Sequence, residues 1–446
     1  MKNKLLFLLM LASIALPFVA CNDDDDDYRT YEVSVQVAYP AETGLAPAAG
    51  VPVKLTNTLD NNEYSAETNV SGIAVFTVPV GIYSVSASET RVNGIETIIL
   101  NASKSSITVT DAWKSEEAVS LDFVASRGGS IIIKEFYFGG CTSPTAEGGE
   151  VAYVADKYVV LYNNSDQTIG IGDLCFGAIT PSNSNQYKEE EYNTYVNSGW
   201  LPGYSAFWGF AGNTNPSLAP GEQIVVSLFG AANNTATYSN SVDLDKASYY
   251  TMYDTENGFN HKKYILPEVI SSSHWMKGYR INVGSAWVIS DTSPGIFIFT
   301  PEGTSVSAFI EEAASTVKLG FFDIKKVPVE WVADAIEVYR PGYEADNGKR
   351  IPPSIDGGYI YSNTKLGYSL YRNVDKEATE AIEGNAGKIV YSYNLGTNGI
   401  DLTYGSTDPS GIDAEASIKK GARIVYKDTN NSGNDFHQRV RATLRD

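Results

Sequence analysis

The chain has few of the residues on which catalytic and metal centres usually depend. Its 446 residues include three cysteines, three histidines and four methionines. The histidines, His261, His274 and His437, lack the i+2 or i+4 partners that are typical of a metal site. The sequence also has no G-x-S-x-G, G-x-x-x-x-G-K-[ST] or H-E-x-x-H motif. We therefore predict no catalytic residues, no metal site and no cofactor.

Helical periodicity and long apolar runs are equally scarce. The one long apolar run, Leu5 to Val19, is too short to span a bilayer. Tyrosine and glycine are abundant instead, with 29 and 39 residues. Residues Tyr31 to Tyr39 alternate between apolar and polar side chains, as in a half-buried strand. Continuous apolar runs such as Ile131 to Ile133 and Ile224 to Leu228 are typical of strands buried on both faces. The prediction is an all-β protein.

Basic side chains are outnumbered by acidic ones. The chain has 33 Lys and Arg against 53 Asp and Glu, a net charge of −20 at pH 7. Removal of Lys2 and Lys4 with a leader would make the charge more negative still. Such a surface repels phosphate groups, so nucleic acid is not an expected partner.

The first residues have the pattern of a lipoprotein leader. A basic start and the apolar run predict a signal peptide over residues 1–20, followed by an acidic tether over 21–29. Cys21 follows Phe18-Val19-Ala20, which resembles the lipobox of bacterial lipoproteins, with Phe18 where Leu is usual. The acids behind it resemble the export signal of Bacteroidetes-type surface lipoproteins: Asp23, Asp24, Asp25, Asp26 and Asp27. A diacylglyceryl group on Cys21 would anchor the chain stably in outer-membrane lipid at the cell surface.

Residues 30–125 carry the motifs of a small sandwich. T-N-x-S-G-x-A-x-F from Thr68 to Phe76 precedes V-G-x-Y-x-V from Val80 to Val85. These motifs resemble prealbumin-like domains related to the carboxypeptidase regulatory domain. The resemblance implies a β-sandwich that serves as a spacer or docking platform.

Residues 126–446 resemble a lamin-tail domain, an immunoglobulin-like sandwich, with long insertions. The matching segments are Lys157 to Asp166, Leu218 to Val226 and Gly367 to Arg372, although Val160 stands where that family usually has Glu. Taken whole, the chain is similar to an uncharacterised family of Bacteroidetes surface lipoproteins of unknown function.

An aromatic insertion between the lamin-tail-like strands is the candidate ligand contact. It runs from Trp200 to Phe210, and the side chains chosen are Trp200, Tyr204, Phe207 and Trp208. Trp and Tyr faces suit stacking on sugar, porphyrin or catecholate rings. The alternative is that the rings fill a core of the insertion itself.

Two further features leave alternatives open. Cys141 and Cys175 could form a disulfide, worth about 3–4 kcal/mol in the chain-entropy model, or remain two thiols. The segment from Asp428 to Asp435 spaces oxygen-bearing side chains like the front of a calcium loop. Its twelfth position is Arg439 rather than an acid, which favours a plain turn.

Together these features predict a non-enzymatic, lipid-anchored binding or docking protein of the outer cell surface. By analogy with similar surface lipoproteins, it would serve a TonB-dependent receptor that imports glycans, haem or siderophores. The alternatives are a structural or adhesive surface protein and, from a different class, a surface hydrolase.

Overall fold

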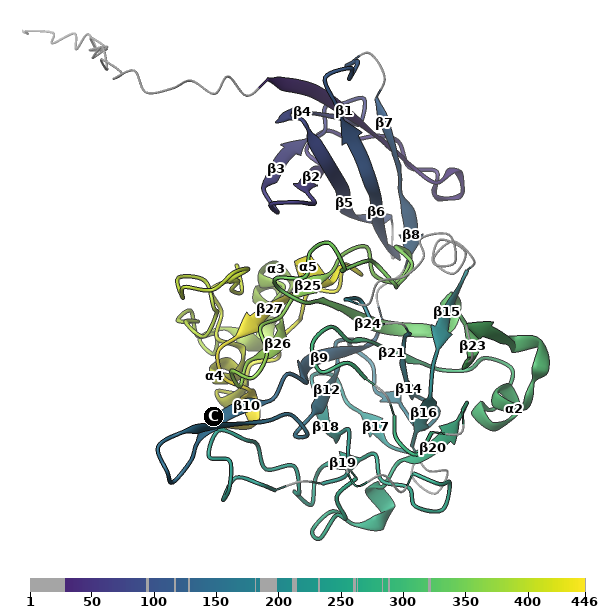
Figure 1. Ribbon diagram of the computed structural model, residues 1–446, viewed down its shortest axis with the longest axis vertical. Helices are drawn as coiled ribbons and strands as arrows, with labels where there is room; N and C mark the ends of the chain where they lie inside the picture. Colours follow the sequence, from purple (N-terminus) through teal and green to yellow (C-terminus); the bar gives the residue numbers. More distant parts are fainter. Residues whose placement is uncertain are drawn as a thin grey trace, which may run out of the picture.

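The computed structural model describes residues 29–445, apart from 94–95, 116–117, 127–128, 181, 185–198, 211–214, 232, 260–261, 263, 283, 288 and 320–321 (Figure 1). Cys21 and the acidic run from Asp23 to Asp27 therefore lie outside the described residues. No helix in the described ranges is long and apolar enough to cross a membrane.

The N-terminal part is a sandwich of two sheets. One sheet has the order β4-β1-β7 and the other the order β3-β2-β5-β6-β8. The strands are β1 (Thr30–Ala38), β2 (Pro52–Asn57), β3 (Glu63–Glu67), β4 (Ile73–Pro79), β5 (Gly81–Asn93), β6 (Glu96–Val109), β7 (Val119–Asp122) and β8 (Val124–Ser126).

Alternation in β1 builds the core of this sandwich. Val33, Val35 and Val37 are fully buried between the sheets, as the pattern from Tyr31 to Tyr39 predicts. Gly72, in the turn before β4, has a φ of +77°, which a residue with a Cβ adopts only with strain. Its N–H donates to the Asn69 carbonyl oxygen at 2.9 Å and closes the turn.

The larger part contains two six-stranded sheets, with the orders β19-β18-β12-β9-β26-β27 and β20-β16-β14-β21-β24-β25. The first comprises β9 (Ile131–Tyr137), β12 (Tyr158–Asn163), β18 (Gln223–Ser227), β19 (Tyr250–Thr251), β26 (Ser369–Arg372) and β27 (Phe436–Arg439). The second comprises β14 (Cys175–Ala178), β16 (Ala206–Gly209), β20 (Lys277–Arg280), β21 (Gly295–Phe299), β24 (Val332–Tyr339) and β25 (Ile360–Tyr361). Apolar side chains from both sheets form one large core, so the predicted all-β sandwich is confirmed.

Smaller elements surround these sheets. A three-stranded sheet of order β15-β23-β22 and the pairs β10-β11 and β13-β17 complete the strands. Their bounds are β10 (Cys141–Pro144), β11 (Glu150–Tyr153), β13 (Ile169–Gly170), β15 (Trp200–Gly203), β17 (Ser217–Leu218), β22 (Thr316–Leu319) and β23 (Phe322–Pro328). The helices are short: α2 (Val306–Glu311), α3 (Lys376–Glu380), α4 (Ala414–Lys419) and α5 (Ser432–Asp435), with single 3₁₀ turns η1 (Ala41–Thr43), η2 (Ser272–His274), η3 (Ala313–Ser315), η4 (Val329–Trp331), η5 (Glu383–Asn385) and η6 (Thr443–Arg445).

The three segments that resemble a lamin-tail domain lie in one sheet. They supply β12, β18 and β26, and β9 lies between β12 and β26. The Asn163 Nδ2 group donates to the Leu218 carbonyl oxygen at 2.7 Å, so the end of the first segment holds the turn of the second. Val160, which replaces the usual Glu, is buried against apolar neighbours.

Hydrogen bonds join the two parts of the chain. Asn101 on β6 donates from Nδ2 to the carbonyl oxygens of Thr429 and Asn430, at 2.7 and 3.0 Å. Asp428 accepts the N–H of Gly129, in the connection after β8, at 2.7 Å. Figure 1 shows the N-terminal sandwich standing on this side of the larger part, above α5 and β25.

Candidate ligand-binding site

The aromatic insertion does not form one surface. Phe207 and Trp208 are adjacent on β16, so their side chains point to opposite faces of the strand. Both faces are covered: Phe207 packs against Phe299 with 4.8 Å between ring centroids, and Trp208 packs against Phe259 at 4.5 Å. Phe207 and Trp208 are fully buried. Their assignment as ligand contacts is therefore corrected: they are core residues of two apolar clusters.

The other two chosen residues remain partly exposed but separate. Tyr204 follows β15 and packs edge-on against Phe322, with 5.3 Å between ring centroids. Trp200, at the opposite end of β15, borders a surface hollow of about 400 Å³. Of the four predicted contacts, Trp200 alone lines this hollow.

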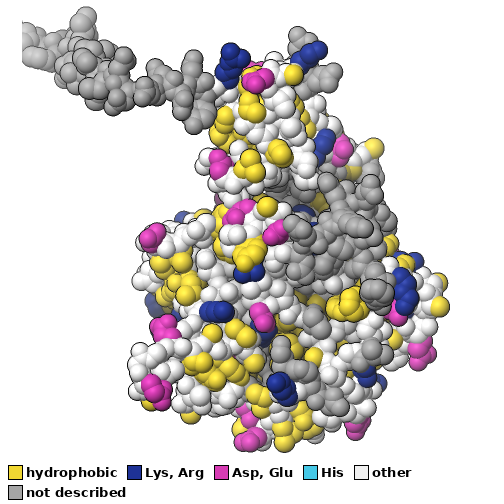
Figure 2. Space-filling view, viewed as in Figure 1, with side chains coloured by type: hydrophobic (Ala, Val, Ile, Leu, Met, Phe, Trp, Pro, Cys, Tyr) yellow, Lys and Arg dark blue, Asp and Glu magenta, His cyan; other side chains and the backbone are white. Residues whose placement is uncertain are grey.

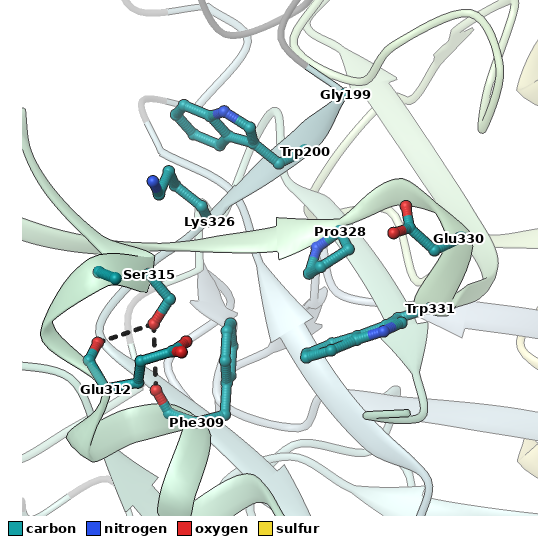
Figure 3. Close-up of a pocket in the computed structure, with 10 residues that line it drawn as sticks. Gly199, Trp200, Phe309, Glu312, Ser315, Lys326, Pro328, Glu330 and Trp331 are labelled. Carbon is teal, nitrogen blue, oxygen red and sulfur yellow. Dashed lines mark hydrogen bonds between the residues drawn. The ribbon is translucent and has the colours of Figure 1, made fainter. Parts of the chain in front are cut away.

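Residues far apart in the sequence surround the hollow (Figure 3). The pairing of Trp200 with Pro328 places β15 beside the end of β23. Proline has no N–H with which to continue the strand, and η4 begins directly after it. This turn brings Glu330 and the partly exposed Trp331 to the rim. In Figure 3, Trp200 and Trp331 lie on either side of Pro328, with Lys326 beside Trp200.

A buried lysine fixes the opposite wall. The Nζ atom of Lys325 donates to the Glu312 carbonyl oxygen, to Ser315 Oγ and to Thr316 Oγ1, each at 2.8 Å. Burial lowers the pKa of Lys325. The Ser315 hydroxyl in turn donates to carbonyl oxygens of Glu312 and Phe309 (Figure 3). These bonds hold η3 and the Glu312 backbone in place at the rim.

The hollow combines aromatic faces with charged groups. The rings of Phe309 and Trp331 meet edge-to-face, with 5.0 Å between their centroids, and form an apolar floor. Lys326, Glu312 and Glu330 line the same space and offer one ammonium and two carboxylate groups. A ring with an apolar face and polar edges fits such a site.

The two cysteines do not form the disulfide that their number allows. Cys141 on β10 and Cys175 on β14 are both free and buried. Cys175 packs in the apolar cluster that contains Phe207 and Phe299, whereas Cys141 lies outside that cluster, 3.9 Å from Ser143 Oγ. Burial raises the pKa of both thiols, which disfavours the nucleophilic thiolate form.

The described histidines have structural surroundings. His437 is buried, with Nδ1 2.7 Å from Asn373 Oδ1 and Nε2 hydrogen-bonded to the Tyr393 hydroxyl, and burial lowers its pKa to about 3. His274 stacks on Tyr250 at 4.3 Å between ring centroids. His261 lies outside the described residues. Within the described ranges, no group of three or more His, Cys, Asp and Glu side chains could hold a metal ion.

The calcium-like segment is a turn organised around an arginine. Asp428 and Asp435 face Arg372, with O–N distances of 3.4 and 3.6 Å. Asp334 forms a closer ion pair with the same guanidinium. Asn431 accepts N–H groups of the first turn of α5 through Oδ1, as an N-cap does. A guanidinium thus supplies the positive charge that these carboxylates require.

Sequence reasoning missed Lys326, Glu330 and Trp331. Each lies in or next to β23, with no motif around it, and only the pairing with β15 brings it to Trp200.

On the face shown in Figure 2, Lys and Arg side chains are scattered singly among acidic and apolar ones.

Residues 219–391 match the model of a family described as protein of unknown function (DUF4876). No curated protein matches the chain. The chain is similar to the crystal structure of a DUF4876 family protein from Bacteroides thetaiotaomicron, with a TM-score of 0.50 and 20% identity over 93% of this chain and 97% of that one. These comparisons show a shared all-β fold and a family match over 219–391, the part of the chain that supplies Lys326, Glu330 and Trp331 to the hollow.

Proposed function

We propose that this chain is a non-enzymatic protein of the outer cell surface, anchored by lipid on Cys21, that captures a glycan in the hollow between Trp200 and Trp331. The observation that carries the proposal is the pair of partly exposed tryptophans around a hollow with charged groups at its rim. Sugar rings have an apolar C–H face and an edge of hydroxyl groups, which match the aromatic and the charged parts of this lining.

The size and the rigidity of the hollow also favour a small ring ligand. About 400 Å³ lies within the range of ligand pockets, near its lower end. The bonds from Lys325 to η3 fix the Glu312 side of the wall before any ligand arrives. A wall that is already ordered loses little conformational entropy on binding.

Trp331→Ala and Trp200→Ala are expected to weaken glycan binding about tenfold or more, because each removes one stacking face, worth about 1.4 kcal/mol or more. The measurement is isothermal titration calorimetry with the strongest ligand from a glycan array. The matched control is Trp275→Ala, since Trp275 is also partly exposed but packs against Tyr253 outside the hollow. Unchanged affinity in both hollow variants would contradict the proposed site.

Hemin and ferric siderophores should be tested for binding by the same calorimetric titration. A hemin complex with a Soret band that His274→Ala abolishes would replace the glycan proposal with a haem-binding one. Cleavage of the bound glycan would contradict a non-enzymatic role.

The proposed partner is a TonB-dependent receptor, supported by the leader, Cys21 and the acidic run behind it. Affinity capture of the tagged, lipidated protein from detergent-solubilised outer membranes is expected to yield a stoichiometric TonB-type barrel. The control is Cys21→Ser, which should leave the membrane fraction because it cannot be acylated. Capture of the bait alone would favour a solitary surface binder or an adhesin.

A further inference from the structure

A buried lysine–carboxylate pair involves β24 and lies outside the lining of the hollow. Glu337 on β24 is fully buried, and its carboxylate oxygen Oε2 contacts the Nζ atom of Lys349. Lys349 Nζ also donates to the Gly358 carbonyl oxygen at 2.7 Å, and its side chain is only 16% exposed. The amine and the carboxyl carbon are therefore held together in a site that excludes most water.

Backbone N–H groups point at the same carboxylate. Arg350 donates its N–H to Glu337 Oε1, and the Ile351 N–H lies 3.3 Å from both carboxylate oxygens. Two consecutive backbone N–H groups on one oxygen are the arrangement that stabilises the oxyanion of a tetrahedral intermediate in acyl transfer.

Burial favours a proton on Glu337. Burial is the largest effect, and together with the negative charge of Asp356 it raises the pKa of Glu337 to about 7, against the opposing effect of Lys349. Asp356 is itself buried, with a raised pKa, and is held by the Ser432 N–H at 2.8 Å. A carboxyl group that carries a proton is a better acyl donor than a carboxylate, because hydroxide is a poorer leaving group than water.

A second buried lysine pair lacks these features. Lys134 Nζ lies 2.5 Å from Glu415 Oε1, which also accepts the Tyr371 hydroxyl at 2.7 Å. Burial raises the pKa of Glu415, but the charge and hydrogen bond of Lys134 outweigh it and bring that pKa below its ordinary value. Glu415 is held as a carboxylate, so this pair is a natural internal comparison.

We propose that Lys349 and Glu337 join in an intramolecular amide in the folded protein. A proton passes from the Lys349 ammonium to the Glu337 carboxylate, which leaves a neutral amine beside a neutral acid. The Nζ–Cδ bond forms while the carbonyl oxygen takes up negative charge against the Arg350 and Ile351 N–H groups. The Nζ proton then moves to the carboxyl hydroxyl, the C–O bond breaks and one water molecule leaves.

Enforced proximity and burial supply the driving forces. Groups held in contact react as if at very high concentration, and no external reagent is needed to balance the step. The product also replaces a buried ion pair, which is costly to keep out of water, with a neutral amide. The cross-link would close the segment between β24 and Lys349 into a covalent ring.

Mass spectrometry of the purified mature chain tests the proposal. We expect an intact mass one water below the mass calculated for the same mature chain without the cross-link. We also expect a tryptic peptide that contains both residues and is uncleaved after Lys349, because trypsin does not cut after an acylated lysine. Fragment ions should place the loss of water on the Glu337–Lys349 ring.

The Lys349→Arg variant should have the full mass calculated for its own sequence. The control variant Lys134→Arg should still be one water lighter than the mass calculated for its sequence. A succinimide at Asp356-Gly357 would also remove one water, but it maps to a different peptide and leaves the cut after Lys349 intact. An unmodified mass with complete cleavage after Lys349 in the wild-type protein would overturn the proposal, whatever the variants do.

Discussion

Trp208→Ala is expected to lower the free energy of unfolding by about 3–5 kcal/mol, the typical loss when a buried aromatic side chain is removed. Trp208 is fully buried between the two large sheets, and its ring meets those of Phe259 and Tyr264 at 4.5 and 5.7 Å between centroids. Its indole Nε1 has no hydrogen-bond partner among the described residues, so the loss is one of apolar packing. The cavity left by the ring adds to the lost burial.

Guanidinium denaturation measures the free energy of unfolding of Trp208→Ala and Trp331→Ala, and the difference between them distinguishes a core tryptophan from a surface one. Trp331 is partly exposed, so its replacement should change stability by about 1 kcal/mol or less. Trp208→Phe should fall between them, since it retains an aromatic ring of smaller volume. Equal stability of Trp208→Ala and the wild type would show that this ring does not belong to the core.

Arg372→Met is expected to destabilise the protein by about 3–5 kcal/mol at neutral pH, because it leaves three buried carboxylates without their counter-ion. Asp334, Asp428 and Asp435 all face this guanidinium, which also donates from Nε to the Ile133 carbonyl oxygen at 2.8 Å. The methionine side chain retains most of the volume, so the loss measures the ion pairs and hydrogen bonds of the guanidinium rather than packing.

The pH dependence of this variant has a defined sign. Burial raises the pKa of Asp334 and of Asp428 in the wild type, although Arg372 opposes the rise. A carboxyl group with a raised pKa binds its proton more tightly when the chain is folded, so folding becomes less favourable as the pH rises through the raised pKa values. Removal of Arg372 takes away the opposing charge and makes this dependence steeper.

The destabilisation by Arg372→Met should therefore be smaller near pH 5 than near pH 8. Denaturant unfolding at both pH values gives the comparison, with Lys54→Met as the control. Lys54 forms an exposed ion pair with Glu63 at 3.0 Å, which contributes about 1 kcal/mol or less at either pH. A loss that stays constant with pH would mean that these carboxyl groups do not titrate in this range.

The sequence predicts elements well where one local pattern determines burial. The alternation from Tyr31 to Tyr39 identified the buried valines of β1, because one face of that strand is covered and the other is not. The lamin-tail-like segments identified strands that share one sheet, because β12 pairs with β18 and β9 joins β12 to β26.

The candidate site was harder to predict because it depends on distant pairings. Trp200 was identified from an aromatic run, but Phe207 and Trp208 in the same run are core, since both faces of β16 are covered. Trp331 enters the site only because Pro328 pairs with Trp200 and ends β23 beside it. No local signal distinguishes an exposed tryptophan from a buried one when the sheet has a layer on each side.

The contacts of Asn101 and Asp428 across the junction determine how a surface-anchored chain would move. These bonds fasten the N-terminal sandwich and its connection to the larger part, so the two parts should move together. With lipid on Cys21, the nine residues of 21–29 would span at most about 30 Å when fully extended. An anchor of that length would keep the sandwich, and with it the hollow, within a short distance of the membrane surface.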